Sequence, residues 1–284
     1  MEGEKRVVAL LHGPDDKGLV AKVANWIYSH GGNILHADQH RDLEAEVFFQ
    51  RVEWLHPVEN WEIESKAFKA FVESLNMNAG IHLVNESPNI ALFVSKTDHC
   101  FHDLVLRWRS SEYPGKIACV ISNHNDLSEE AEHYGLPYYH LPVSKLNKSE
   151  AEGKQLAILE KYKIHLVILA RYMQILSPEF VQNSPCSIIN IHHSFLPAFV
   201  GAKPYHQAYQ RGVKIIGASA HYVTEELDGG PIIQQDVARI NHRHSVEDII
   251  RRGKDLEKAV LSQAVRWHLE HRVLGYEGKT VVFD

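Results

Sequence analysis

Hydrophobic and polar positions along residues 1–85 predict four strands and two helices. Uninterrupted apolar runs bounded by Gly, Pro, Asn and Asp indicate strands, and apolar residues three or four positions apart indicate helices. In chain order the predicted elements are a strand at 6–11, a helix from about 18, strands at 33–40 and 45–54, a helix at 63–75 and a strand at 80–84. This βαββαβ order predicts a ferredoxin-like domain built on a split βαβ unit.

The hydrophobic pattern changes after a polar break at Asn85–Pro88. From there, apolar strands without polar alternation alternate with helical patterns. The predicted strands lie at 90–94, 117–121, 138–141, 166–169, 187–191, 215–222 and 280–283, and the predicted helices lie at 101–108, 128–134, 149–162 and from 245. Strands of this kind belong to a sheet covered on both faces, so we expect a doubly wound, mostly parallel α/β domain. The expected domains are 1–85 and 86–284.

Composition excludes several classes of partner. The 284-residue chain has 30 Lys and Arg against 36 Asp and Glu, a formal charge of −6, so we expect neither nucleic acid nor a membrane as a partner. Cys100, Cys119 and Cys186 form no C-x-x-C pair, which argues against a disulfide scaffold or a thiolate zinc site. No apolar run is long enough for a signal peptide or a membrane helix, which predicts a cytoplasmic protein.

Three polar side chains are candidates for chemistry in the second domain. Asn190 and His192 are two residues apart at the exit of the strand at 187–191, so they share one side of it. The loop at 223–231, after another strand, carries Asp228 followed by two glycines. Because ligands bind beyond the carboxyl ends of parallel strands, we expect the three side chains to meet there.

An amide, an imidazole and a carboxylate suit attack on a carbonyl by an external nucleophile. No recognisable Ser or Cys nucleophile motif accompanies them. Asn190 would donate to the developing oxyanion, and His192 would give or take a proton. Asp228 would orient and charge the imidazole and handle the proton of the nucleophile.

The same residues also have purely structural interpretations. His192 can be a satisfied residue at a strand end, Asn190 can cap a turn, and 227–230 can be a simple loop. Four other histidines are expected to be surface or loop residues, or donors that support the site indirectly: His206, His221, His242 and His244.

Three ordered motifs resemble the formyltetrahydrofolate-dependent formyltransferase family. They are Ala170–Ser177, Asn190–Pro197 and His221–Thr224 with Leu227–Ile233. The resemblance implies that the matching Asn, His and Asp are catalytic, that no metal or other cofactor is needed, and that 10-formyltetrahydrofolate is the substrate. It also marks five candidates for a folate pocket: Met173, Leu176, Val223, Thr224 and Leu227.

The formyl acceptor is inferred from a departure from the family pattern. Members that use glycinamide ribonucleotide carry a Gly-rich phosphate loop after the first strand, whereas this chain reads Lys96-Thr97-Asp98 there. Water is therefore the expected acceptor, and the chain resembles the formyltetrahydrofolate deformylases of one-carbon metabolism, which release formate and tetrahydrofolate and are linked to purine biosynthesis. The alternatives are a transformylase acting on a small amine such as glycinamide ribonucleotide, and a sensor that binds folate without turnover. A third alternative is a metal-dependent hydrolase using His192, His193 and Asp228.

The first domain carries a second resemblance. Residues 15–21 followed by 32–34 resemble an ACT domain, a regulatory fold that often binds amino acids. The resemblance implies an effector such as glycine or methionine at Gly18 and Asn33, and pairing of subunits into a homo-oligomer, a dimer or tetramer. The alternative is that both residues only form turns. Whether Lys203 and Tyr205 gate the entrance to the catalytic site stays open.

Overall fold

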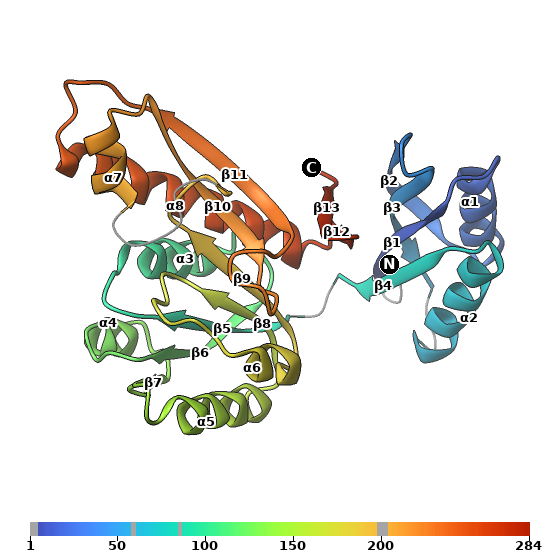
Figure 1. The fold of residues 1–284 in the computed structure, drawn as a ribbon. Helices are drawn as coiled ribbons and strands as arrows, with labels where there is room; N and C mark the ends of the chain where they lie inside the picture. The colour runs from blue at the N-terminus through green and yellow to red at the C-terminus, as the bar shows by residue number, and fades with distance from the viewer. Residues whose placement is uncertain (1–4, 58–60, 85–86, 198–203) are drawn as a thin grey trace. The chain divides into compact units, whose positions relative to one another are not determined.

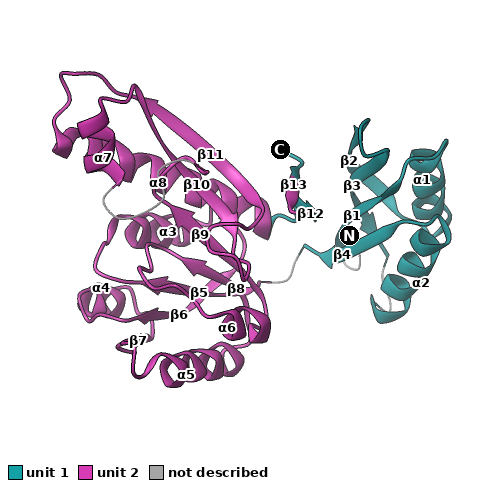
Figure 2. Ribbon diagram, in the orientation of Figure 1, with its two compact units in different colours: residues 1–86, 270–276, 281–284 teal, residues 87–269, 277–280 magenta. Residues whose placement is uncertain are grey.

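The chain forms two compact units. The structure, a computed structural model, describes residues 5–57, 61–84, 87–197 and 204–284 (Figure 1). Unit 1 comprises residues 1–86, 270–276 and 281–284, and unit 2 comprises residues 87–269 and 277–280 (Figure 2). This division differs from the predicted one, because two C-terminal segments belong to the first unit.

Unit 1 contains the six elements expected for its first 85 residues. They are β1 (Lys5–Pro14), α1 (Leu19–Ser29), β2 (Asn33–Asp42), β3 (Val47–His56), α2 (Trp61–Ser74) and β4 (Asn78–Leu83). The strands form one sheet in the order β2-β3-β1-β4, and every neighbouring pair is antiparallel. Val23 and Ile27 of α1 and Phe68 and Val72 of α2 are buried against Val52 and other apolar residues of the sheet.

The C-terminal segments join unit 1 because β1 and β3 carry apolar residues on the second face of their sheet as well. Leu10, Val47 and Phe49 form a second core cluster with Leu274 and Phe283. Leu274 belongs to the hairpin of β12 (Val273–Tyr276) and β13 (Lys279–Val282), and Phe283 directly follows that hairpin. The buried Arg51 of β3 also donates to the carbonyl oxygens of residues 270 and 271 at 3.2 and 3.0 Å.

Unit 2 is built on a seven-stranded sheet. Its strands are β5 (Asn89–Val94), β6 (Lys116–Ser122), β7 (Tyr138–His140), β8 (Ile164–Leu169), β9 (Ser187–His192), β10 (Ile215–Tyr222) and β11 (Ile232–Arg239). In the order β11-β10-β9-β8-β5-β6-β7, the five strands from β9 to β7 run parallel. The other two strands are antiparallel to their neighbours. The predicted mostly parallel sheet is confirmed.

Helices cover both faces of this sheet. They are α3 (His99–Arg109), α4 (Ser128–His133), α5 (Lys148–Lys161), α6 (Pro178–Asn183), α7 (Pro204–Arg211) and α8 (Val246–Leu269). α3 and α8 lie on one face, and α5 and α6 lie on the other (Figure 1). None of the helices within the described ranges is long and apolar enough to cross a bilayer.

Four elements were not predicted: α6, α7, β11 and β12. The two helices are only one or two turns long and begin at a proline, which reads as a turn in an isolated sequence. β11 is an edge strand with mostly partly exposed positions, so it lacks the apolar run of its neighbours. The predicted start of the last helix is confirmed, because Ser245 and Asp248 each bond the backbone N–H of the other at 3.1 Å.

Candidate active site

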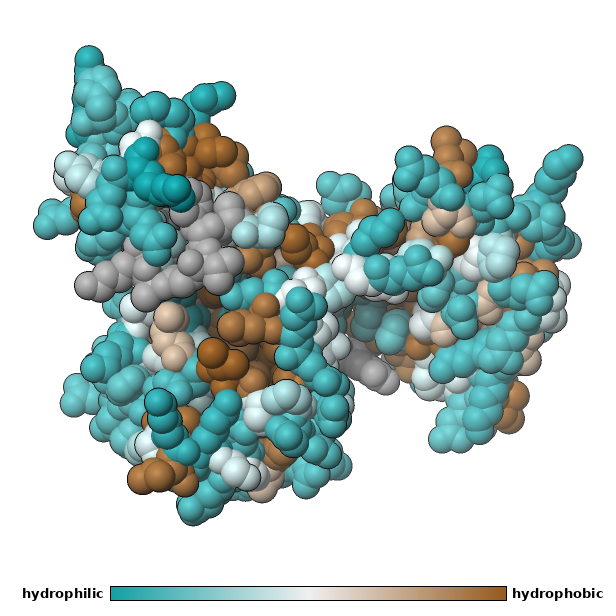
Figure 3. All heavy atoms as spheres, viewed as in Figure 1, coloured by the Kyte–Doolittle hydropathy of each residue, from teal (hydrophilic) through white to brown (hydrophobic). Residues whose placement is uncertain are grey.

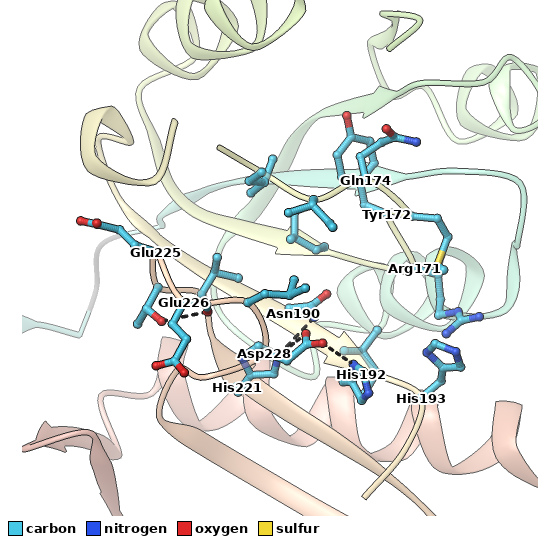
Figure 4. Close-up of a pocket in the computed structure, with 18 residues that line it drawn as sticks. Arg171, Tyr172, Gln174, Asn190, His192, His193, His221, Glu225, Glu226 and Asp228 are labelled. Atoms are coloured by element: carbon cyan, nitrogen blue, oxygen red, sulfur yellow. Dashed lines mark hydrogen bonds and ion pairs between the residues drawn. The ribbon is translucent and has the colours of Figure 1, made fainter. Parts of the chain in front are cut away.

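A cavity of about 310 Å³ opens in unit 2 between three segments. The segments are the chain after β8, the end of β9, and the loop after β10 (Figure 4). Met173, Ile175 and Leu227 line it and are more than half exposed. Figure 3 shows apolar side chains gathered around a hollow on the visible face of unit 2. Such an apolar wall suits a flat heteroaromatic ligand.

The structure brings the three predicted catalytic residues together at one end of this cavity (Figure 4). Asn190 and His192 are the fourth and sixth residues of β9 and share one face of the strand. His192 Nδ1 lies 3.3 Å from Asp228 Oδ2, and the His192 residue is only 8% exposed. A carboxylate at this distance orients the imidazole ring.

His221 is a fourth polar residue of this cluster, and it was not assigned to the site from the sequence. It lies opposite Asn190 across the β9–β10 pair and is 2% exposed, so of the two expected alternatives it is not a surface or loop residue but one that supports the site indirectly. Its Nε2 lies 3.2 Å from Asn190 Nδ2 and 3.7 Å from Asp228 Oδ1. Its Nδ1 lies 2.8 Å from the carbonyl oxygen of Tyr222. That oxygen can only accept, so His221 Nδ1 carries a proton.

The reason predicted for this convergence is wrong. Two parallel strands were expected to deliver their loops to one sheet edge, but β10 runs antiparallel to β9. The loop after β10 instead starts beside the beginning of β9, where the N–H of Val223 donates to the Ile188 carbonyl at 2.8 Å. The loop then folds back over the cavity, and this reversal brings Asp228 to His192.

The loop that holds Asp228 is tightly constrained. Asp228 adopts a left-handed conformation with φ of 54°. A Cβ on Gly230 would overlap the carbonyl oxygen of Tyr222, so only glycine fits there. The N–H of Tyr222 donates to the Pro231 carbonyl at 2.9 Å and closes the loop.

Asp228 is held in its ionised form. The His192 imidazole and, after it, the nearby His221 imidazole hold the pKa of Asp228 well below its usual range, although burial acts in the opposite direction. A permanently charged carboxylate can stabilise an imidazolium, but it has little affinity for a proton of its own.

All five predicted folate-pocket residues line the cavity: Met173, Leu176, Val223, Thr224 and Leu227. Ser95, which the sequence did not single out, holds the first of them in place. The Met173 N–H donates to Ser95 Oγ at 3.0 Å, and Ser95 Oγ donates to Asn123 Oδ1 at 2.6 Å. Ser95 is 2% exposed and follows β5, so it ties the pocket to the sheet.

The segment after β8 has two further anchors on α5. Gln155 Nε2 donates to Tyr172 Oη at 2.9 Å, and burial raises the pKa of Tyr172 to about 12. Glu152 accepts from the backbone N–H and the hydroxyl of Ser177 at 2.9 and 2.7 Å. Glu152 therefore stabilises this wall of the pocket from within α5.

Glu257 of α8 forms a buried network behind the cavity, and it was also missed. Its carboxylate is 1% exposed and receives His99 Nε2 at 2.8 Å and the hydroxyl of Tyr205, with Arg171 Nε at 3.3 Å. Burial alone would raise its pKa, but the His99 hydrogen bond and the Arg171 charge bring the pKa below its usual value. The tyrosine hydroxyl reaches Glu257 because its ring lies against Gly253, where any Cβ would overlap it.

Among the described residues, the group that could supply three or more metal ligands is His99, Cys100 and Glu257, whose ligand atoms lie within 4.8 Å of one another. The Arg171 guanidinium beside Glu257 opposes a cation there. Burial raises the pKa of the Cys100 thiol well above its ordinary value, so it stays protonated. The group contains none of the residues named in the metal-hydrolase alternative.

The remaining candidates lie elsewhere. Gly18, with φ of 81°, precedes α1, and Asn33 begins β2 after that helix has ended. Tyr205 is 8% exposed, which does not suit a gate, and Lys203 lies outside the described residues. Of the other predicted histidines, His206 and His242 are exposed, and His244 Nδ1 accepts from the N–H of its neighbour Asn241 at 3.0 Å.

Comparisons with known proteins identify the family of this chain. A family model for formyl transferases matches residues 88–265. Over 274 residues the chain is 51% identical to the formyltetrahydrofolate deformylase of Synechocystis sp., and the match covers 95% of both chains. The crystal structure of a formyltetrahydrofolate deformylase from Pseudomonas syringae pv. tomato superposes with a TM-score of 0.94 and 46% identity, covering 100% of this chain and 96% of that one.

Transformylases match less of the chain. Glycinamide ribonucleotide transformylase 1 from Symbiobacterium toebii superposes with a TM-score of 0.65 and 28% identity, covering 72% of this chain and 97% of its own. The deformylase relatives match both units, whereas this transformylase leaves more than a quarter of the chain unmatched. The chain therefore belongs to the formyl transferase family and, within it, to the formyltetrahydrofolate deformylases.

Proposed function

We propose that this chain hydrolyses 10-formyltetrahydrofolate to formate and tetrahydrofolate, with water as the formyl acceptor. The observation that carries the proposal is the meeting of Asn190, His192 and Asp228 at one end of an apolar cavity. Membership of the deformylase family supports it.

The apolar part of the cavity would hold the pterin and place N10 near the polar end. Met173 and Leu176 come from one wall, and Val223 and Leu227 come from the other. Because Ser95 and Glu152 hold the first wall rigid, little ordering entropy is lost on binding. The wall is thus prepared for a flat ring before the ligand arrives.

Asn190 would supply the main oxyanion donor. His221 Nδ1 carries a proton, so in the neutral ring its Nε2 is bare and accepts one N–H of the Asn190 amide at 3.2 Å. This contact sets the amide orientation and leaves the second N–H free to point into the cavity. A preorganised donor of this kind stabilises a developing negative charge without reorganisation during the reaction.

His192 would be the second donor and the group that Asp228 charges. Since the ionised carboxylate can only accept, the His192 Nδ1 that faces it carries a proton. His192 Nε2 is buried with no hydrogen-bond partner among the described residues. That nitrogen is available to donate to the formyl oxygen when the ring is protonated.

The start of α3 favours water over a phosphorylated amine as acceptor. Asp98 is the N-cap residue of that helix and carries a negative charge where a phosphate would dock. His99, next in the chain, is already paired with the buried carboxylate of Glu257. Two acidic groups near this end of the helix oppose a phosphate dianion.

The direct test is to incubate the purified protein with 10-formyltetrahydrofolate alone and to measure formate and tetrahydrofolate. Release of both without any added amine supports hydrolysis. A requirement for glycinamide ribonucleotide would support the transformylase alternative instead. Tight folate binding with no product in either reaction would support the sensor alternative.

We also infer that unit 1 is an ACT-type regulatory domain that pairs between subunits and binds glycine or methionine. Its element order and antiparallel sheet support this inference. Gly18 and Asn33 flank opposite ends of the 11-residue α1, about 16 Å apart along its axis. A small amino acid would thus touch both only if they came from two copies. Two measurements test the inference: calorimetric titration with each amino acid, and the molecular mass of the protein in solution. A monomer that binds neither amino acid would refute it.

A further inference from the structure

His193 lies beside His192 in the wall of the cavity, and the hydrolysis proposed above gives it no role. The two ring centroids are 5.4 Å apart, with an angle of 41° between the planes. A hydrogen bond from an O–H donor to a ring nitrogen is about 2.8 Å long, so one small molecule can contact both rings. In Figure 4 the two rings lie on the same side of Asp228, with His193 next to Arg171.

The surroundings of His193 keep its ring neutral. Burial and the Arg171 guanidinium lower its pKa to about 4, and His192 adds to that effect. Glu257 and Asp228 act in the opposite direction but do not reverse it. Tyr205 packs edge-on against the ring, with the centroids 6.1 Å apart. At neutral pH the ring therefore offers one nitrogen lone pair to a donor in the cavity.

The other polar groups of the site are poorly suited to take the proton of water. Asp228 directs its two oxygens at His192 and His221, so both oxygens already face other side chains. His192 presents Nδ1–H to that carboxylate and has its Nε2 left for the formyl oxygen. Asn190 is a donor. Of these neighbours, only His193 both has a nitrogen lone pair and lies in the same wall of the cavity as His192.

We propose that His193 holds the attacking water and accepts its proton, which makes it a catalytic residue of this reaction. The proposal rests on the hydrolysis proposed above. In the first step the water oxygen bonds to the formyl carbon, one O–H bond breaks, and the proton passes to the His193 ring. The carbonyl π pair moves to the formyl oxygen, where Asn190 and His192 donate to it.

In the second step the carbonyl re-forms and the bond from carbon to N10 breaks. N10 takes the proton that His193 carried, so the imidazole returns to its neutral form. The formic acid released ionises to formate in solution. Water needs such a base because it is a weak nucleophile, whereas an uncharged amine is nucleophilic enough to attack before it loses a proton. His193 thus adapts the formyltransferase site to water.

Two variants test the proposal, His193→Asn and His193→Phe, with His206→Asn as the matched control on an exposed histidine of α7. Both His193 variants should lose about 10²- to 10⁴-fold in kcat for formate release while KM for 10-formyltetrahydrofolate is unchanged. The control should keep the wild-type rate. Calorimetric binding of tetrahydrofolate and an unchanged unfolding transition confirm that each variant is folded. A wild-type kcat in folded His193→Asn and His193→Phe overturns the proposal.

Hydroxylamine provides a second test, because it would not restore activity if His193 had only a structural role. It attacks formyl groups without a base, so it should restore tetrahydrofolate release in His193→Asn and form formohydroxamate. It should not restore Asn190→Ala, which lacks the oxyanion donor. If hydroxylamine leaves His193→Asn inactive, His193 does not serve the nucleophile and the proposal fails. Failure of the proposed hydrolysis is separately visible, because the wild-type protein would then release no formate.

Discussion

The Asn190 amide and the His221 ring face each other across two antiparallel strands, with 3.2 Å between Asn190 Nδ2 and His221 Nε2. The Tyr222 carbonyl fixes the tautomer of His221, and His221 in turn fixes the direction of the amide. The orientation of the proposed oxyanion donor is therefore set by a buried histidine on the neighbouring strand.

Replacing this histidine should misalign the donor without removing it. In His221→Phe, Asn190 loses the acceptor that orients it, so kcat should fall by up to about 10²-fold, which is the low end of the cost of deleting an oxyanion donor. Steady-state kinetics against the exposed control His242→Asn measure the effect. Equal rates in the two variants would mean that the amide needs no such partner.

Deleting the donor itself should cost more. Asn190→Ala should reduce kcat by about 10²- to 10³-fold and leave KM nearly unchanged, because the oxyanion exists only in the transition state. Rates and tetrahydrofolate affinity measured on the same preparation separate these two quantities. A raised KM at constant kcat would instead place Asn190 in ground-state binding.

Asp228→Asn should lower the rate and should also change how the stability of the fold depends on pH. An amide at this position can donate to His192 Nδ1, which favours the wrong tautomer, so kcat should fall by about 10²- to 10⁴-fold. The folded pKa of Asp228 lies below its unfolded value of 3.8, so the folded state binds this proton less readily than the unfolded state. Its ionisation therefore stabilises the fold above the unfolded pKa, and this contribution is lost as the pH falls through the folded pKa.

Urea unfolding of wild type and Asp228→Asn at neutral pH and below about pH 3 checks the sign of this effect. The wild-type advantage in unfolding free energy should shrink in acid. An advantage that grows in acid would mean that the carboxylate is not ionised in the folded state. Full wild-type turnover by the variant would show that His192 works without a neighbouring charge.

Strand positions were largely predictable from the sequence, but strand directions were not. The bounds predicted for the strand at Ile215–Tyr222 agree with β10, because the apolar run and its flanking polar residues mark it clearly. Nothing in that run records whether the strand lies parallel or antiparallel to β9. The convergence of Asn190, His192 and Asp228 was thus expected from a geometry that the structure does not have.

The buried polar residues that support the site were missed because they lie on faces that read as apolar. Glu257 shares the buried face of α8 with Ile249, Gly253 and Val260. An acidic residue at helical spacing within such a face was the available signal, since a buried carboxylate requires partners. Those partners, His99 and Arg171, are distant in sequence, and no local pattern indicates them.

Gly253 offers a test of this network that does not touch the reacting groups. Glycine inside a helix usually costs about 1 kcal/mol relative to alanine, so Gly→Ala at an open position should stabilise the protein. At Gly253 the added methyl would overlap the Tyr205 ring and push its hydroxyl away from Glu257. Gly253→Ala should therefore destabilise the fold by about 1–3 kcal/mol, as overpacked cores do.

Gly153 of α5 is the matched control, because a Cβ there meets no atom within 4 Å. Chemical denaturation of the two variants should give changes in unfolding free energy of opposite sign. Gly253→Ala should also lower kcat, since Tyr205 packs on both Gly253 and His193 and its displacement frees the His193 ring. If Gly253→Ala is as stable and as active as Gly153→Ala, the contact between Tyr205 and Gly253 does not hold the buried carboxylate network in place.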